Sequence, residues 1–174
     1  MGVIVGQNNF IGEGMTDFTI RKCRSEDASV ILGFITELAV YEKAEQEVVA
    51  SEQDIKDSLF GDGTTTFALI CEVDNQPIGF AVYFYNYSTW LGKHGLYLED
   101  LYITPSERGS GAGKALIQHL AQIAVEKKCG RFEWSVLDWN EPAIKFYESI
   151  GARPQPEWIG YRLSGQELLD FARG

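Results

Sequence analysis

Hydrophobic and polar positions along this chain follow two periods, and the period changes at one glycine-rich stretch. From Leu96 to Ile103, apolar residues surround an acidic pair, Glu99 and Asp100, which is typical of a half-buried strand. Thr104-Pro105 ends this strand, because proline has no N–H for a sheet ladder. Beyond the glycines, helical spacing predicts a helix to Cys129 with its apolar side at Leu116, Leu120, Ile123 and Ala124.

The same reading predicts a mixed α/β fold, with a largely antiparallel central sheet flanked by helices and a βαβ unit around the glycines. A helix capped by Ser25 should run to about Tyr41, and an aromatic-rich loop is expected at 84–90. We expect a leader at 1–16 and a single domain over 17–174. Further strands are predicted at 17–23, 66–73, 77–85, 131–136 and 158–163, and further helices at 52–60, 140–150 and 166–172.

Composition restricts the class of protein. The chain has 174 residues, of which 45% are hydrophobic and 23% charged, and this profile is typical of a globular protein. Its apolar runs fall short of the ~20 residues that span a bilayer, so we expect no membrane partner. A net charge of −10 disfavours nucleic acid. Three cysteines without CxxC spacing favour a reduced, cytoplasmic protein, and no ligand spacing suggests a metal.

Charge is distributed unevenly along the chain. From Glu37 to Asp62, eight acidic residues stand against two lysines, whereas from Leu101 to Arg131 five basic residues stand against two acids. Acidic helix faces are often simply solvated. A cationic ligand near the acidic window and an anionic ligand near the basic window would nevertheless both be favoured.

The glycine turn, Arg108-Gly109-Ser110-Gly111-Ala112-Gly113, joins a strand to a helix. Free backbone N–H groups and the positive end of the helix dipole meet there, so the turn suits a phosphate. A P-loop is excluded because Lys114 is followed by Ala115 rather than Ser or Thr. A dinucleotide-binding fold is disfavoured because these glycines alternate and lie late in the chain.

Two residues are candidates for proton transfer. Simple alternation places Glu99 on one strand face with Tyr97, Leu101 and Ile103, and a lone acid there is costly unless it is paired or used. Glu99 is therefore a carboxylate paired with a basic residue, a base acting through water, or an anchor for a cation. Tyr147 lies on an apolar helix face, where a core tyrosine is the ordinary interpretation.

Two motifs in order resemble a known superfamily. The pattern Arg-x-x-Gly-x-Gly after an acid-bearing strand resembles the acetyl-CoA signature of the GNAT N-acetyltransferases. The segment from Asn140 to Ala152 resembles the Asn…Phe-Tyr…Gly segment of the same superfamily. Shorter segments at 37–42, 90–93, 96–100 and 139–142 resemble the spermidine/spermine (diamine) and thialysine acetyltransferase group.

The resemblance implies an enzyme that moves acetyl from acetyl-CoA to a primary amine of a small cation, such as a polyamine, a diamine or a thialysine-like compound. It makes Tyr147 the acid that protonates the departing thiolate and Glu99 the residue that binds and deprotonates the amine. The implied cofactor-binding residues are Leu101, Tyr102, Ile103, Arg108, Gly109, Ser110, Gly111, Ala112, Gly113, Lys114, Asn140, Glu141, Pro142, Ala143 and Tyr147. The implied substrate-binding residues are Tyr41, Glu42, Glu99, Asp100, Glu133, Trp134 and Ser135.

The resemblance also implies a homodimer, about which the residues themselves say nothing. Two alternatives stay open. One is a non-catalytic sensor of acyl-CoA with the same fold, and the other is a GNAT enzyme that acetylates another amine, such as an amino acid or a protein lysine.

Overall fold

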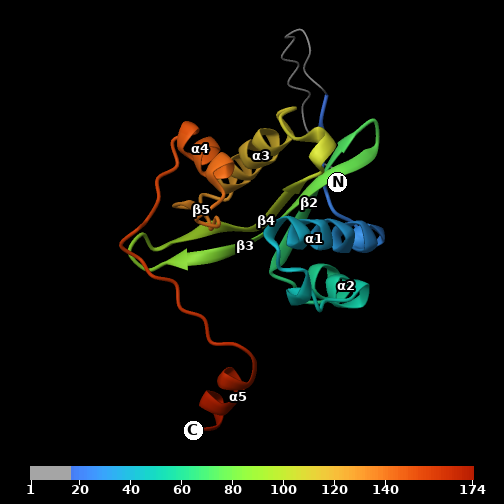
Figure 1. Ribbon diagram of the computed structural model, residues 1–174. Coiled ribbons are helices and arrows are strands. Elements are labelled where there is room, and N and C mark those ends of the chain that lie inside the picture. The colour runs from blue at the N-terminus through green and yellow to red at the C-terminus, as the bar shows by residue number, and fades with distance from the viewer. Residues whose placement is uncertain (1–16) are drawn as a thin grey trace. The chain divides into compact units, whose positions relative to one another are not determined.

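The computed structural model describes residues 17–174, and the chain forms two compact units, Met1–Ser135 and Val136–Gly174 (Figure 1). We call them the first unit and the second unit. The leader expected at 1–16 lies outside the described residues. The single domain expected over 17–174 stays a prediction.

The first unit is built on a five-stranded sheet whose strands lie in sequence order. All neighbouring strands are antiparallel except the last two, which are parallel and joined through a helix. The predicted mixed α/β sheet with a βαβ unit is therefore confirmed. The strands are β1 (Thr19–Lys22), β2 (Thr66–Val73), β3 (Gln76–Ser88), β4 (Lys93–Ile103) and β5 (Phe132–Trp134).

Helices cover both faces of this sheet (Figure 1). The helices α1 (Ala28–Glu42) and α2 (Glu52–Phe60) pack on one face, where Phe34 stacks on Phe80 with ring centroids 5.8 Å apart. The helix α3 (Ala112–Glu126) packs on the other face. Its Gly113 lies so close to the sheet that an added Cβ would touch Ile103 at 3.9 Å and Leu101 at 4.0 Å.

Predicted helix starts are confirmed in one case and wrong in another. Ser51 caps α2, because its hydroxyl accepts from the Asp54 N–H at 3.2 Å and the Asp54 carboxylate accepts from the Ser51 N–H at 2.8 Å. Ser25 does not cap α1. It begins a 3-10 turn (Ser25–Asp27) that precedes the helix, and the Asp27 carboxylate accepts from the Arg24 N–H at 2.7 Å.

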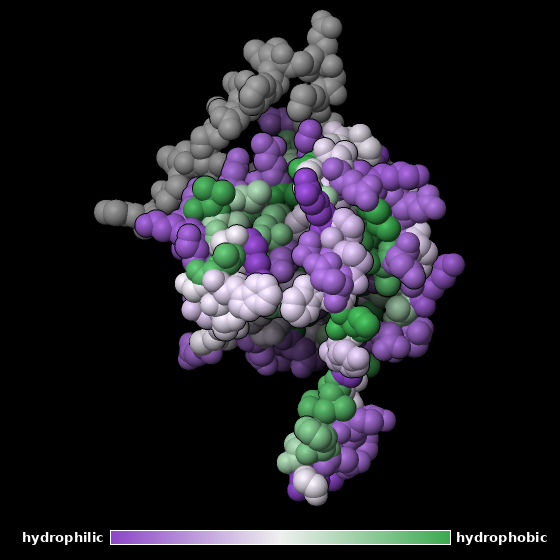
Figure 2. Space-filling model, turned by 90° about the vertical axis from the view of Figure 1, so that its left-hand side faces the viewer, coloured by the Kyte–Doolittle hydropathy of each residue, from purple (hydrophilic) through white to green (hydrophobic). Residues whose placement is uncertain are grey.

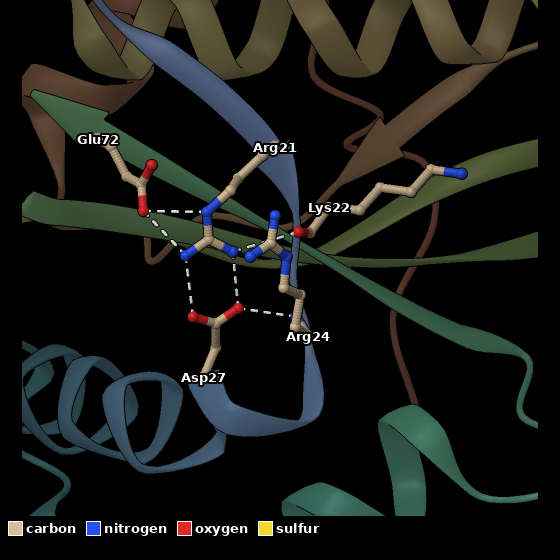
Figure 3. Close-up of polar contacts among 5 residues, drawn as sticks. All are labelled: Arg21, Lys22, Arg24, Asp27 and Glu72. Carbon is tan, nitrogen blue, oxygen red and sulfur yellow. Dashed lines mark hydrogen bonds and ion pairs between the residues drawn. The ribbon is translucent and has the colours of Figure 1, made fainter. Parts of the chain in front are cut away.

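An ion-paired group fixes this turn to the sheet (Figure 3). Arg21 on β1 donates two hydrogen bonds to the Asp27 carboxylate, at 2.7 and 2.9 Å, and one to Glu72 on β2 at 2.9 Å. Both carboxylates belong to buried residues. The Arg21 guanidinium lowers the pKa of Asp27, so the ionised carboxylate stabilises the fold.

Two predicted segments differ from the structure. The expected loop at 84–90 is instead the end of β3 as far as Ser88, because each aromatic there gains a partner on β4, as Phe84 does in Tyr97. The strand expected at 158–163 is not formed. A strand needs a neighbour for its hydrogen bonds, and the regular elements of the second unit are the helices α4 (Glu141–Ser149) and α5 (Gly165–Arg173).

Candidate active site

A β-bulge at Glu99 interrupts the pairing of β3 with β4. Val82 pairs with Asp100, but the next residue, Tyr83, pairs with Leu98, so Glu99 is an extra residue on β4. Such a bulge bends its strand and redirects the side chains around it. Glu99 is exposed, as a base that acts through water requires.

The bulge changes which side chains share a face. Because paired residues point the same way, Leu98 joins Leu101 and Ile103 on the α3 side of the sheet, and Tyr97 lies on the opposite, α1 side. The predicted grouping of Tyr97 with Leu101 and Ile103 is therefore wrong. Strict alternation fails here because it does not allow for one extra residue.

Asp100 follows the bulge and is half-buried. Burial, with the nearby charges of Glu99 and Glu42, raises the pKa of Asp100 to about 6. Burial also raises the pKa of Glu42, at the end of α1. The Asp100 carboxylate makes neither a hydrogen bond nor an ion pair with any residue in the described part of the chain. A carboxylate in this position would gain from a cationic ligand.

The outer edge of β4 is open beyond the bulge. Only Leu96–Leu98 pair with β5 among the described residues. The Thr104 N–H donates to the Ile78 carbonyl at 2.8 Å, and main-chain groups alternate in an antiparallel ladder. The groups of Leu101 and Ile103 therefore face the open edge, whereas those of Tyr102 face β3. This arrangement directs the N–H and carbonyl of Leu101 and the N–H of Ile103 toward an extended ligand, whereas the Ile103 carbonyl already accepts from Arg108 Nε.

The glycine turn positions backbone N–H groups at the start of α3. Gly109 and Gly111 have φ of 83° and 101°, which favour glycine, and Gly111 is the N-cap. The first-turn amides of a helix lack intrahelical partners, so those near Gly113 and Lys114 suit an anion.

Arg108 has contacts within the protein as well. Its Nε donates to the Ile103 carbonyl at 3.0 Å, and its guanidinium lies 4.8 Å from the Tyr41 ring centroid and 5.4 Å from that of Tyr102. The Tyr102 hydroxyl donates to Glu37 at 2.8 Å. Arg108 therefore connects the glycine turn to the end of α1, where the predicted substrate residues Tyr41 and Glu42 lie.

A second polar group, the β5 cluster, consists of Asn86, Arg131 and Glu133. Glu133 Oε2 lies 2.7 Å from Arg131 Nε and accepts a hydrogen bond from Asn86 Nδ2 at 2.8 Å. Arg131 crosses Gly95, because a Cβ on Gly95 would lie 2.9 Å from Arg131 Cγ. Sequence reasoning selected Glu133 but missed its two partners.

Residues around β5 divide between the two faces. The Tyr97 hydroxyl and Ser135 Oγ are hydrogen-bonded at 2.8 Å, and Glu133 pairs with Tyr97 on the α1 side. Trp134 pairs with Leu98 and so lies on the α3 side. The structure therefore brings Glu133 and Ser135 to the face of Asp100 but does not bring Trp134 there.

The two missed residues, Asn86 and Arg131, are only weakly indicated by the sequence. Asn86 lies in a segment interpreted as a loop, and the β4 partner that identifies its face appears only once β3 is extended. In the sequence, Arg131 is only one of five basic residues between Leu101 and Arg131. Its ion-pair partner Glu133 lies two residues later, which is the spacing expected for two side chains on one side of a strand.

The second unit holds the remaining predicted residues. Asn140 caps α4, because its Oδ1 accepts from the Ala143 N–H at 3.4 Å, and Pro142 occupies the first turn. Glu141 is exposed and lies 3.1 Å from Lys145 Nζ. Tyr147 is half-buried, and burial raises its pKa above the ordinary value, so its phenol stays protonated at neutral pH.

Residues 17–174 contain no group of three or more His, Cys, Asp and Glu that could hold a metal ion. None of the helices in this range has the length and apolar character needed to cross a membrane.

Comparison with known proteins identifies the class. The chain belongs to the Acetyltransferase (GNAT) family, which it matches over residues 31–152, and it is an acetyltransferase. Thialysine N-epsilon-acetyltransferase of Sus scrofa is 35% identical over 91% of this chain and 99% of that protein. Spermidine/spermine N(1)-acetyltransferase-like protein 1 of Homo sapiens is also 35% identical, over 91% of this chain but only 24% of that protein.

Among solved structures, an integron cassette protein from the mobile metagenome of V. cholerae is similar with a TM-score of 0.76 and 30% identity. The match covers 92% of this chain and 100% of that one. The resemblance inferred from the two sequence motifs is confirmed for both family and fold.

Proposed function

We propose that this enzyme transfers acetyl from acetyl-CoA directly to a primary amine of a small cationic substrate, such as a polyamine, a diamine or a thialysine-like compound. The observation that carries the proposal is Asp100, a half-buried carboxylate without an ion-pair partner in the described chain, next to Glu42 and to the bulge at Glu99. Relatives named for thialysine and for spermidine/spermine support this substrate class.

Glu99 and Tyr147 would handle the protons. An alkylammonium has a pKa near ~10.4, so it must lose a proton before it can attack. Glu99 would take this proton through water, and the amine nitrogen would then bond to the thioester carbonyl carbon while the carbon–sulfur bond breaks. The Tyr147 hydroxyl would give its proton to the departing thiolate and recover one from the acetylated amine through solvent.

The first unit would hold most of acetyl-CoA. Open-edge main-chain groups of Leu101 and Ile103 would bond its pantetheine arm like an added strand. The amides of Gly109 to Lys114 would bind its pyrophosphate at the start of α3. Asn140 to Ala143, in the second unit, are the remaining proposed contacts.

The amine would be bound mainly by charge. Glu42, Glu99 and Asp100 would supply negative charge, and Tyr41, which precedes Glu42 in α1, is a further proposed contact. Glu133 and Ser135 extend the same face. A homodimer and a cytoplasmic location are further proposals, and they rest on the family resemblance and on free cysteines at Cys23, Cys71 and Cys129.

The test combines a substrate panel with two substitutions. Thiol release from acetyl-CoA would be measured with spermidine, putrescine, thialysine and lysine. Glu99→Gln and Tyr147→Phe should each lower kcat by roughly 10²-fold or more while CoA binding is retained.

Matched controls are Glu126→Gln and Tyr87→Phe, which alter an exposed glutamate and an exposed tyrosine of the first unit. Both should leave kcat unchanged. Full activity in both site variants would contradict the assigned roles, and turnover of none of the four amines would contradict the substrate class.

A further inference from the structure

The β5 cluster places a basic side chain, Arg131, beside the acidic Glu133 on the sheet face that carries Asp100. Arg131 and Glu133 are 38% and 36% exposed, so both are accessible to a ligand. Arg131 uses Nε for Glu133, and its two terminal nitrogens make no hydrogen bond to residues in the described part of the chain. Glu133 Oε1 is likewise not bonded to a described residue, whereas its Oε2 is fixed by Arg131 and by Asn86.

The distance along the sheet between the Arg131–Glu133 pair and Asp100 follows from the strand register. Glu133 pairs with Tyr97, and Arg131 crosses Gly95 on the same face. Asp100 is three residues beyond Tyr97 with one bulge residue between, so two to three strand steps, ~7–10 Å, separate the two positions. A short aliphatic chain can span this interval.

The charges at the two ends differ. Near Asp100, Glu42 and Glu99, the environment is wholly acidic and suits one ammonium group. At the β5 cluster, an exposed guanidinium and an exposed carboxylate lie 2.7 Å apart and present both signs. A diamine offers only positive charge there and would be repelled by Arg131. An α-amino acid head group, with its own carboxylate and ammonium, complements both.

We propose that the β5 cluster recognises the zwitterionic head group of an α-amino acid whose side-chain amine is acetylated near Asp100. Arg131 binds the α-carboxylate through its terminal nitrogens, and Glu133 binds the α-ammonium through Oε1. Asn86 positions Glu133. The inference rests on the proposed function, and it selects amino acids with a terminal side-chain amine over polyamines and diamines.

Paired substrates that differ only in the carboxylate test it. Lysine and cadaverine form one pair and ornithine and putrescine another, and lysine methyl ester keeps the backbone but removes the negative charge. We expect kcat/KM to be at least about tenfold higher for each amino acid than for its diamine, since one charge-assisted hydrogen-bonded contact is worth that much. The methyl ester should behave like cadaverine. Equal or better use of the diamines by the wild-type enzyme would overturn the inference.

The variant Arg131→Met keeps the aliphatic stem and removes the charge. It should reduce the lysine-to-cadaverine ratio of kcat/KM by about tenfold, because kcat/KM for lysine loses the contact with the α-carboxylate. Arg131→Lys should restore part of the ratio. Lys56→Met, at a partly exposed lysine of α2 that is likewise paired with a glutamate, is the matched control and should leave the ratio unchanged. If Arg131→Met leaves the ratio unchanged, the arginine is only structural and the inference is wrong.

Binding distinguishes failure of this inference from failure of the proposed function. Calorimetric titration of lysine and of cadaverine into the wild-type protein without acetyl-CoA needs no turnover. A preference for lysine that Arg131→Met abolishes supports the β5 cluster even if another acyl donor is used. Turnover of amines without any such preference in binding or in kcat/KM leaves the proposed function intact and overturns this inference.

Discussion

The two units differ in where their apolar side chains lie. The first unit buries a core on both faces of its sheet, with Phe80, Leu116 and Leu120 fully enclosed. In residues 136–174 no side chain is buried, and Trp158, Ile159 and Phe171 are 67%, 77% and 80% exposed. Figure 2 shows apolar residues gathered along one side of α5. Isolated helices of this length are marginal in water, so the first unit supplies most of the stability.

The residues of the proposed site are also divided between the two units. The carboxylates, the open strand edge and the glycine turn belong to the unit with the core, which holds them on packed elements. Tyr147 belongs to the unit without one. Four experiments test how far this contrast extends, in order of decreasing effect.

Separate expression of the units should give the largest difference. Residues 17–135 should unfold cooperatively on heating, whereas residues 136–174 alone should show no cooperative transition by circular dichroism, because they lack a core. Residues 17–135 should have no acetyl transfer above background without Tyr147. A sharp transition in the isolated second unit would contradict the comparison.

Truncating one leucine in each unit should sharpen the comparison of their apolar cores. Leu116→Ala removes a fully buried side chain and should lower the free energy of unfolding by about 2–5 kcal/mol. Leu169→Ala, at a half-exposed position of α5, should change it by less than about 0.5 kcal/mol. Urea denaturation measures both. Similar losses for the two variants would show that the exposed apolar side of α5 is covered in solution.

Acid stability should depend on the first unit through Asp27. Its pKa is lowered by Arg21, so its stabilising effect is present above the unfolded pKa of about 4 and is lost as pH falls through the lower folded value. Asp27→Asn should therefore cost about 1–3 kcal/mol at pH 7 and much less near pH 2. Asp62→Asn, at an exposed position, serves as the control. A pH-independent effect of Asp27→Asn would exclude the ionic explanation.

The pH profile of kcat/KM should have an acid limb set by the first unit and an alkaline limb set by the second unit. Asp100 has its pKa raised to about 6, so protonation below that pH removes its attraction for the amine. The ionised fraction of Asp100, and with it the contribution of Asp100 to kcat/KM, should fall about tenfold between pH 7 and pH 5. Asp100→Asn should flatten this acid limb of the profile. The raised pKa of Tyr147 should keep an alkaline limb above about pH 10. An unchanged acid limb in Asp100→Asn would assign it to another group.

Local features were predictable because they depend on near neighbours in the chain. The strands predicted at 66–73 and 77–85 form a hairpin, and Asp74 and Asn75 in its turn have φ of 50° and 61°, which these residue types tolerate. The strand, glycine turn and helix around Arg108 follow from spacing. The same spacing carried the resemblance to the acetyltransferase family. Where a segment depends on a distant partner, as at 84–90 and 158–163, the prediction was wrong.

The sequence by itself therefore determined the family, the glycine turn between β4 and α3, and the identity of the candidate acid and base. Only the tertiary structure decided which faces they occupy. Whether Glu99 is an extra residue depends on how β3 pairs with β4, and that bulge moves Tyr97 to the face of Asp100. The partnership of Arg131 with Glu133 and Asn86 likewise requires three strands side by side. Strand register is set by long-range packing, which a local pattern does not encode.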